Sequence, residues 1–362
     1  MPNPVAHIVG ARPNFMKAAP IVKNLKAIDS TPQLLVHTGQ HYDPALSSIF
    51  FDQLEMPAPD RYLGVGSGSH AVQTAALMTA LEGVFIDDEP TACVVYGDVN
   101  STVAAALVAS KLGIPVVHVE AGLRSFDRSM PEEINRLLTD AISDLLLVTS
   151  PEAYGNLGNE GIDIDKIRFV GNTMIDSLQA GLELISRQPP LLPFEVPKQF
   201  VLVTLHRPAN VDDPERLAEI LAALSVVSSD IDCLFPVHPR GREAIELAGG
   251  TTIKGLSLLE PQGYLEFLTL QRDAALVITD SGGVQEETTV LGTPCITVRP
   301  NTERPITVSM GTNQLAEPET LAAAAKEMLS SPPNGEVPPL WDGRAGGRAA
   351  AAIVDWLARS SG

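Results

Sequence analysis

Residues 93–124 read CVVYGDVNSTVAAALVASKLGIPVVHVEAGLR, and this stretch decides the fold. Two short apolar runs rich in β-branched residues, 93–96 and 116–119, enclose a longer helix-like run at 102–112. Adjacent parallel strands need such a crossover, so the pattern indicates a βαβ unit. Polar residues follow both strands, at the strand ends where open α/β sheets bind ligands.

The same alternation of strand-like and helix-like runs continues on both sides of this stretch. In the first half it covers 5–9, 17–27, 34–38, 132–142, 145–149, 152–159, 167–170 and 174–185. After prolines at 189, 190, 193 and 197 it begins again with 200–205, 214–227, 233–237, 264–271, 275–279, 284–291 and 295–298. The sequence therefore predicts an α/β protein of two Rossmann-like, doubly wound domains that face a central cleft.

Length and composition support two domains. A chain of 362 residues exceeds what one hydrophobic core usually organises, and 44% hydrophobic residues suffice for two cores. We place the first domain at 1–171 plus 346–362 and the second at 172–345. The last segment carries an apolar stripe, which predicts a helix that returns to the first domain and joins the halves.

Charge and cysteine usage exclude several classes of protein. A net charge of -19 disfavours nucleic acid and anionic membrane surfaces as partners, because both are polyanions. Cys93, Cys233 and Cys295 lie far apart in apolar runs, which indicates buried packing and neither a disulfide framework nor a metal site. Without a signal peptide or an apolar run of membrane-spanning length, a cytoplasmic location is expected.

Two segments favour a bound diphosphate. Gly10–Asn14 follows the first strand with Arg12, and Lys17 comes one turn later in the helix. The alternative is an ordinary βα turn with solvated charges, and the G-x-G-x-x-G fingerprint of dinucleotide sites is absent. Ser281-Gly282-Gly283 offers backbone N–H groups at a helix start, where the helix dipole favours phosphate.

Side chains near the second segment extend the predicted site. Glu286 or Glu287 could accept hydrogen bonds from ribose hydroxyls, or only stabilise the helix dipole. Arg304 adds a cation in a loop after a buried strand. His206 ends another strand and His238 an equivalent one; either could be a structural hydrogen-bonding group, and His206 is favoured for chemistry because prolines surround His238.

Three carboxylates in the first half suggest acid/base chemistry. Asp98 and Glu120 follow adjacent strands, and Glu132 opens a helix. The alternative is a salt-bridge network with arginines 124, 128 and 136, or a helix-start charge at Glu132. Clustering at strand ends favours the catalytic interpretation.

The chain resembles the non-hydrolysing UDP-N-acetylglucosamine 2-epimerases, a family with the two-domain glycosyltransferase-B-like fold. The resemblance rests on motifs that occur in order between Gly10 and Pro305: GARPNFMK, HTGQHYD, GDVNST, HVEAGLR, PEEINR, DSGGVQEE and TERP. It implies an isomerase that acts on a UDP-sugar without a metal or other cofactor and forms a homodimer.

Matching positions imply roles for individual residues. The diphosphate side would be held by Arg12, Lys17, Ser281, Gly282, Gly283 and Arg304. Glu287 would meet the ribose, and Gln262 and Phe267 would flank the uracil. The sugar-facing catalytic group would be Asp98, Glu120, Glu132 and His206, and which of them serves which face of C2 stays open.

The chemistry explains this choice of residues. The hydrogen on C2 of an N-acetylhexosamine is not acidified by a carbonyl, so the anomeric C–O bond must break first. Cations and a helix end would stabilise the departing UDP, and a carboxylate could then remove the proton to give a bound 2-acetamidoglucal. Three alternatives remain: a hydrolysing epimerase that releases N-acetylmannosamine and UDP, a glycosyltransferase of the same fold, and a nucleotide-sugar sensor without turnover.

Some positions depart from the family pattern. Ala11 and Asn14 stand where common bacterial members have threonine and glutamate, which leaves the exact N-acylhexosamine open. Some members bind a second substrate molecule as activator. Gln40, Arg207 and His238 match that second site, whereas residues 64–70 lack the arginine expected there.

Overall fold

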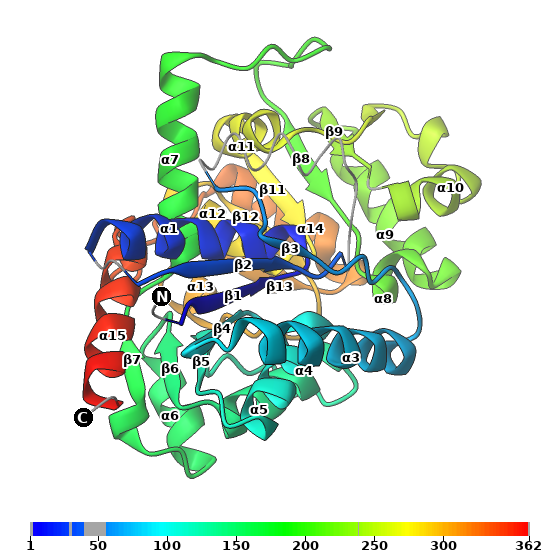
Figure 1. Cartoon of the computed structure of the whole chain (residues 1–362). Coiled ribbons are helices and arrows are strands. Elements are labelled where there is room, and N and C mark those ends of the chain that lie inside the picture. The colour runs from blue at the N-terminus through cyan, green and yellow to red at the C-terminus, as the bar shows by residue number, and fades with distance from the viewer. Residues whose placement is uncertain (1–2, 29–30, 40–55, 238, 361–362) are drawn as a thin grey trace. The chain divides into compact units, whose positions relative to one another are not determined.

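The computed structural model describes residues 3–28, 31–39, 56–237 and 239–360 (Figure 1). The chain divides into two compact units: unit 1 comprises Met1–Ala180 and Pro339–Gly362, and unit 2 comprises Gly181–Pro338. Helix α7 (Thr173–Arg187) contains the first of these boundaries. The domain limits derived from the sequence stay a prediction, because compact packing does not test which segments fold on their own.

Unit 1 is built on a parallel seven-stranded sheet in the order β3-β2-β1-β4-β5-β6-β7. Its strands are β1 (Val5–Val9), β2 (Gln33–His37), β3 (Arg61–Tyr62), β4 (Ala92–Tyr96), β5 (Val116–Ala121), β6 (Leu145–Val148) and β7 (Ile167–Phe169). The other helices are α1 (Arg12–Ile28), α3 (His70–Asp88), α4 (Asn100–Lys111), α5 (Pro131–Ile142), α6 (Glu152–Asn159), the 3-10 helix η1 (Ile164–Lys166) and α15 (Ala345–Ser360).

Unit 2 repeats this plan with a parallel six-stranded sheet in the order β10-β9-β8-β11-β12-β13. Its strands are β8 (Val201–Thr204), β9 (Cys233–Pro236), β10 (Leu256–Leu259), β11 (Leu276–Thr279), β12 (Cys295–Val298) and β13 (Asn313–Ala316). Its helices are α8 (Pro208–Val211), α9 (Pro214–Val227), α10 (Pro239–Leu247), η2 (Gly250–Thr252), α11 (Tyr264–Asp273), α12 (Gly282–Leu291), α13 (Ile306–Ser309) and α14 (Pro318–Ser330).

Both sheets show the strand order of doubly wound folds, which confirms the predicted fold class. The order reverses between β1 and β4 in unit 1 and between β8 and β11 in unit 2. Open α/β sheets bind ligands at the carboxyl ends of the strands beside this reversal. The turns after these four strands are therefore the first places to look for a site.

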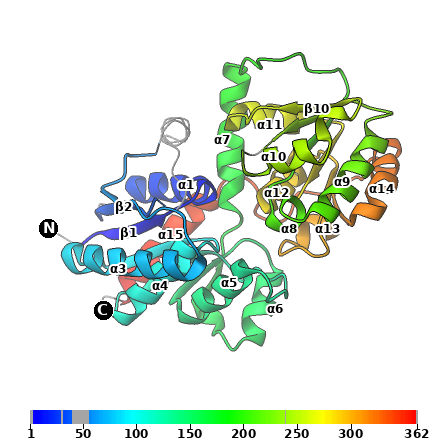
Figure 2. The same cartoon turned by 90° about the vertical axis from the view of Figure 1, so that its right-hand side faces the viewer.

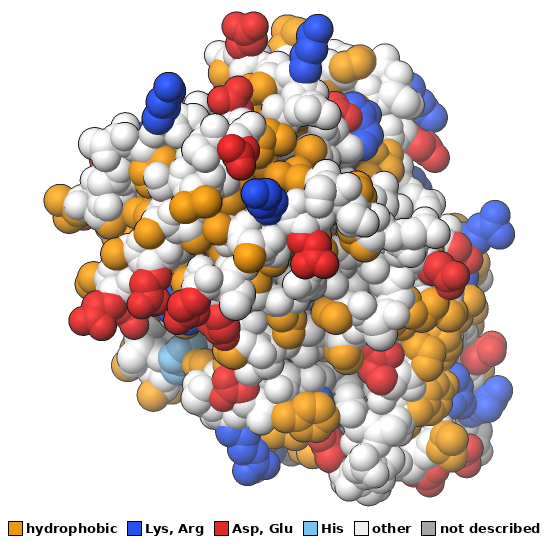
Figure 3. Space-filling model, turned by 180° about the vertical axis from the view of Figure 1, so that it is seen from behind, with side chains coloured by type: hydrophobic (Ala, Val, Ile, Leu, Met, Phe, Trp, Pro, Cys, Tyr) orange, Lys and Arg blue, Asp and Glu red, His pale blue; other side chains and the backbone are white. Residues whose placement is uncertain are grey.

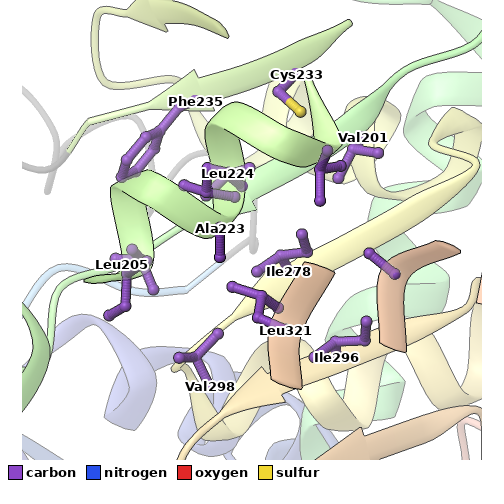
Figure 4. Packing of buried hydrophobic residues seen from close by; sticks show 14 of the residues in the cluster. Val201, Leu205, Ala223, Leu224, Cys233, Phe235, Ile278, Ile296, Val298 and Leu321 are labelled. Carbon is purple, nitrogen blue, oxygen red and sulfur yellow. The ribbon is translucent and has the colours of Figure 1, made fainter. Parts of the chain in front are cut away.

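Alternating side chains pack helices on both faces of each sheet. In unit 1, α1 and α15 cover the face with Val5 and Val9, and α3 and α4 cover the face with Ala6 and Ile8 (Figure 2). The predicted returning helix thus packs on α1 within unit 1. In unit 2, α9 and α14 cover one face, with Leu224 and Leu321 packed towards Ile278 and Ile296 of the sheet (Figure 4). The packing of helices on both sheets holds in place the strand ends at which the predicted site residues lie.

The cysteines pack in the cores, as the sequence predicted. Cys93, Cys233 and Cys295 are buried and free. Burial raises the pKa of all three thiols, to about 12 for Cys233 and Cys295, so they are inert packing groups. Within the described ranges, no helix combines the length and the apolar character needed to cross a bilayer.

Candidate active site

The turn after β1 is tied to the end of β4 by Asn14. Its Oδ1 accepts hydrogen bonds from the N–H groups of Gly10 (3.1 Å) and Ala11 (3.0 Å), and its Nδ2 donates to Tyr96 O at 2.8 Å. This asparagine, one of the departures from the family pattern, therefore holds both strand ends at the sheet reversal. Arg12 begins α1, and its side chain lies outside the described part of the chain.

Glu120 is held in an unusual backbone conformation beside Lys17. It lies in β5 at φ 72°, next to a register shift between Val119 and Ala121. A non-glycine residue in this conformation costs about 1–3 kcal/mol, so the surroundings must impose it. The carboxylate is 3% exposed, and its Oε2 lies 2.7 Å from Lys17 Nζ. Local strain thus places a buried carboxylate and a buried ammonium side by side.

Gly97 makes room for this pair. It has φ 64°, and a Cβ built there would lie 2.8 Å from Lys17 Nζ and 3.9 Å from Glu120 Oε1. The next residue, Asp98, forms an ion pair with Arg136 and keeps 21% of its side chain exposed. Asp98, Glu120 and Lys17 therefore meet around one glycine turn at the carboxyl ends of β4 and β5. Lys17, predicted on the diphosphate side, contacts the carboxylate in this arrangement.

Helix α5 supports the Asp98 turn from the side. Asn135 donates to Asp98 O at 2.8 Å, and Arg136 also contacts Glu133 at 2.6 Å. Burial would raise the pKa of Glu133, but hydrogen bonds from the Ser125 N–H and hydroxyl and from Arg136 lower it. Glu133 is thus a structural anion. Glu132, half-buried, lies one turn before Asn135 and Arg136 on the same helix face and forms no ion pair within the described residues.

In unit 2, His206 is paired with Asp280 across the sheet reversal. The His206 Nδ1 lies 3.0 Å from Asp280 Oδ1, and the ring is 43% exposed while the carboxylate is buried. Asp280 also accepts hydrogen bonds from the N–H groups of His206 and Arg207 and from Asn210. Burial would raise the pKa of Asp280, but His206 and these donors lower it, so the carboxylate is ionised. Asp280 therefore orients an accessible histidine.

The start of α12 is the predicted anion site. Ser281 is the N-cap, and its hydroxyl makes no capping hydrogen bond, so the first N–H groups of the helix point to the strand end. Arg304 lies directly against this turn: a Cβ on Gly282 would be 2.4 Å from its Nη1. Only glycine allows the guanidinium to come this close. Ser281, Gly282, Gly283 and Arg304 thus meet as predicted.

Buried charges surround Arg304. Its Nε lies 2.8 Å from Glu286 Oε1, and its Nη1 pairs with Glu303. Glu303 is also contacted by Arg299 at 2.7 Å and by Arg207 at 3.6 Å. Burial would raise the pKa of Glu303, but Arg304, Arg299 and Arg207 hold it well below its usual range. Arg304, Arg299 and Arg207 thus offset the buried carboxylates Glu286 and Glu303 beside the helix start.

The residues predicted around ribose and uracil lie on neighbouring elements of unit 2. Glu287 is buried and accepts hydrogen bonds from Tyr264 (3.3 Å) and Gln271 (2.8 Å). Gln262 lies in the loop before α11 and donates to Glu260 O, and Phe267 packs on the apolar core under α11. The contacts of these residues with ribose and uracil stay predictions.

Comparison with known proteins identifies the family. The sequence model of the UDP-N-acetylglucosamine 2-epimerases matches residues 23–354. The chain belongs to this family. It is 42% identical over 353 residues to the UDP-N-acetylglucosamine 2-epimerase of Methanocaldococcus jannaschii, which covers 94% of this chain and 96% of the relative. It is 40% identical over 361 residues to the UDP-2,3-diacetamido-2,3-dideoxy-D-glucuronate 2-epimerase of Pseudomonas aeruginosa, with coverage of 97% and 98%.

A solved structure of the same epimerase family has the same fold. The crystal structure of the Methanocaldococcus jannaschii enzyme in complex with UDP-GlcNAc and UDP gives a TM-score of 0.89 at 40% identity, covering 97% of this chain and 99% of that chain. The family and the glycosyltransferase-B-like fold class inferred from the motifs are thereby confirmed. Epimerases are isomerases, so the predicted enzyme class is confirmed as well.

The predicted site residues of this epimerase fall into groups. Asp98, Glu120 and Lys17 meet in unit 1, and Ser281–Gly283 and Arg304 meet in unit 2. Gln40 and His238 lie outside the described residues, so the second nucleotide-sugar site stays a prediction. Arg207, its third member, donates from Nε to Asp280 O at 3.2 Å. The catalytic and binding roles of all these residues remain predictions.

Sequence reasoning assigned no role to several buried partners. Asp280 directly follows β11, and the rule that found Asp98, an acid at a strand end, would have found it too. Glu303 and Arg299 gave no such signal, because only the folded loop brings them to Arg304. Asp140 and His118 were equally hidden, since an acid inside a helix and a histidine inside a strand usually have structural roles.

Proposed function

We propose that the chain interconverts UDP-N-acetylglucosamine and UDP-N-acetylmannosamine, or a close UDP-N-acylhexosamine pair. The observation that carries this proposal is the strained Glu120 beside Lys17 at the sheet reversal of unit 1, in a member of the epimerase family. The names of its relatives give the substrate class, and two of them differ in the sugar. The proposal therefore includes both sugars as candidates.

The anion site of unit 2 supports departure of UDP as the first step. The C1–O bond breaks and its electron pair leaves with the β-phosphate, whose charge the α12 start and Arg304 would stabilise. Arg304 is buried, in contrast to the acidic side chains exposed on the face that Figure 3 shows. Such a buried, preorganised cation stabilises a leaving group better than a solvated one.

The carboxylates of unit 1 support the proton transfers. As C1 gains oxocarbenium character, the C2 proton becomes acidic and an ionised carboxylate takes it, which gives 2-acetamidoglucal and UDP. Re-addition of UDP with protonation of C2 on the opposite face completes epimerisation without water. The two faces require one protonated and one ionised group, and Asp98, Glu120, Glu132 and His206 are the candidates.

Turnover in deuterated water tests this mechanism directly. The purified chain is incubated with UDP-N-acetylglucosamine in D₂O, and C2 is followed by NMR. We expect deuterium at C2 of the product, because the proton that returns comes from a group that exchanges with solvent. The 2,3-diacetamido glucuronate analogue, tested in parallel, shows which sugar is preferred.

Each competing function gives a different result in this experiment. A hydrolysing epimerase would release free N-acetylmannosamine and UDP, and a glycosyltransferase would give no product from the donor alone. A sensor would bind the nucleotide sugar and leave it unchanged. Turnover with complete retention of the C2 proton would contradict the proposed elimination.

A homodimer is also proposed, with α3 and α5 of unit 1 at the interface. Both helices expose apolar side chains: Val72 (65%) and Ile86 (59%) on α3, and Ile134 and Leu138 on α5. Contiguous exposed apolar surface often marks a protein interface, and identical chains usually associate through the same patch on each copy.

Light scattering after size exclusion tests this interface. We expect twice the mass of one chain for the wild type and a shift towards the monomer for Val72→Glu, because the new charge would be buried between the copies. The matched control is Leu247→Glu, which places the same charge at an exposed apolar residue on α10 of unit 2. It should leave the mass unchanged. A monomeric wild type would contradict the proposal.

A cytoplasmic location is proposed as well. The three free thiols suit a reducing compartment, where disulfides are rare.

A further inference from the structure

Asp140, inside α5, is fully buried and contacts three groups of the β5 segment. Its Oδ1 lies 2.6 Å from His118 Nδ1, and its Oδ2 accepts from Gly122 N–H at 3.0 Å and lies 2.7 Å from Arg124 Nη2. His118 and Arg124 are buried as well. A buried carboxylate is costly unless it is paired and hydrogen-bonded, and here all its contacts go to one short stretch of chain.

The contacts of Asp140 bracket Glu120. His118 lies two residues before it and Gly122 two residues after it, and one carboxylate holds both. Between them β5 shifts register, and Glu120 takes its left-handed conformation. Gly122 follows at φ 76°, where a Cβ would lie 2.7 Å from the Ala153 side chain. Asp140 therefore fastens both ends of the bulge that aims Glu120.

The same carboxylate reaches the Asp98 turn through His118. The other ring nitrogen, Nε2, lies 2.8 Å from Gly97 O. A backbone carbonyl has no proton to donate, so Nε2 must be the donor. Burial would raise the pKa of Asp140, but His118 and Arg124 lower it. His118 therefore joins the Asp140 carboxylate to the Gly97 turn through its two ring nitrogens.

Arg124 is held from two sides beside this bulge. It pairs with Glu160 through Nε (2.8 Å) and Nη2 (2.6 Å). Its Nη2 also lies 2.7 Å from Asp140 Oδ2. Arg124 thus faces two carboxylates, Asp140 and Glu160, and offsets part of the charge of the buried Asp140.

We propose that Asp140 is a positioning residue that sets the geometry of both Glu120 and Asp98, through the β5 backbone and through the His118 ring. The inference rests on the proposed function, because it assigns the reacting carboxylates to these two positions. It places one buried side chain, remote in sequence from both, in control of the acid/base pair.

Asp140→Asn tests this role, because asparagine keeps the size but replaces one carboxylate oxygen by an NH₂ group, so it cannot accept from His118, Gly122 and Arg124 together. We expect kcat to fall about 10- to 100-fold, the usual consequence of a misplaced catalytic group. The affinity for UDP, measured by calorimetry, should stay within about threefold, because most of the predicted UDP contacts, among them Ser281, Gly282, Gly283 and Arg304, lie in unit 2. The matched control is Asp144→Asn: Asp144 accepts from Val116 N–H at 2.9 Å at the opposite end of β5, so kcat should not change.

The ring of His118 gives a readout that needs neither turnover nor a variant. In protein labelled with ¹⁵N-histidine, we expect a solvent-protected ring whose Nε2 carries a proton, because Nε2 donates to Gly97 O. In Asp140→Asn this proton should exchange faster with solvent, because the ring has lost its contact with the carboxylate.

The outcomes separate this inference from the proposed function. A wild type that does not turn over the UDP-sugars refutes the proposed function, and the ring signal still decides whether Asp140 holds His118 on the Gly97 turn. A wild-type His118 without a protected Nε2 proton, or an Asp140→Asn variant with normal kcat, overturns the inference. If Asp140→Asn does not fold, the ring signal of the wild type decides alone.

Discussion

Glu120→Gln should lower turnover by about 10²-fold or more, while the affinity for UDP stays near that of the wild type. Glutamine keeps the size and can still accept a hydrogen bond from Lys17, but it cannot take a proton from C2. The backbone should keep its left-handed conformation, because the contacts of Asp140 with His118 and Gly122 do not involve the Glu120 side chain. The loss should therefore fall on kcat.

Initial rates with UDP-N-acetylglucosamine and calorimetry with UDP measure this effect. Glu89→Gln is the matched control: Glu89 also has positive φ (43°), but it ends α3 and lies on the surface. The control should keep normal turnover. Near-normal turnover of Glu120→Gln would reduce Glu120 to a structural anion for Lys17.

Arg304→Ala should weaken UDP binding by about 10- to 100-fold, since a charge-assisted hydrogen bond to phosphate contributes roughly 1.5–3 kcal/mol. The structure adds a second reason. Without Arg304, Glu286 loses a partner at 2.8 Å and Glu303 loses one of its three cations, so the helix start becomes less positive. The remaining carboxylates would then repel the diphosphate.

Calorimetric titration of UDP into the variant measures the change in affinity. Arg304→Lys should give an intermediate affinity, because it keeps the charge and loses the planar fork of donors. Arg272→Ala, which removes an arginine that pairs with Asp273 on the surface of α11, should bind UDP normally. Unchanged affinity in Arg304→Ala would remove Arg304 from the diphosphate site.

Periodicity predicted most of the regular elements, and its failures have a physical cause. The βαβ run at 93–119 and helix α9 agree with the structure, because short β-branched runs and longer runs of helix-forming residues follow one another there. Helix α3 was not predicted. Its residues, His70–Asp88, are apolar on most sides, so no helical period stands out, although only five of them are buried. A helix whose faces do not differ in hydrophobicity gives no periodic pattern in the sequence.

Reasoning from strand ends located much of the predicted site, but it did not show which side chains contact one another. It placed Asp98, Glu120 and Ser281 at strand ends, and the structure agrees. It could not show that Lys17 lies against Glu120, because that contact depends on a glycine turn far along the chain. Partners such as Asp140 lie several elements away from the residues they hold, and no local pattern reports them.

The two ends of the chain share one apolar layer, which has a consequence for biosynthesis. Ala349, Ala350 and Ile353 of α15 complete the packing over Val5, Ile21 and their neighbours at the beginning of the sequence. A nascent chain leaves the ribosome from its amino end, so every residue of unit 2 emerges before this layer can close. A ribosome that stops short of residue 345 therefore releases a polypeptide whose earliest-made sheet has only α1, and not α15, on one of its faces.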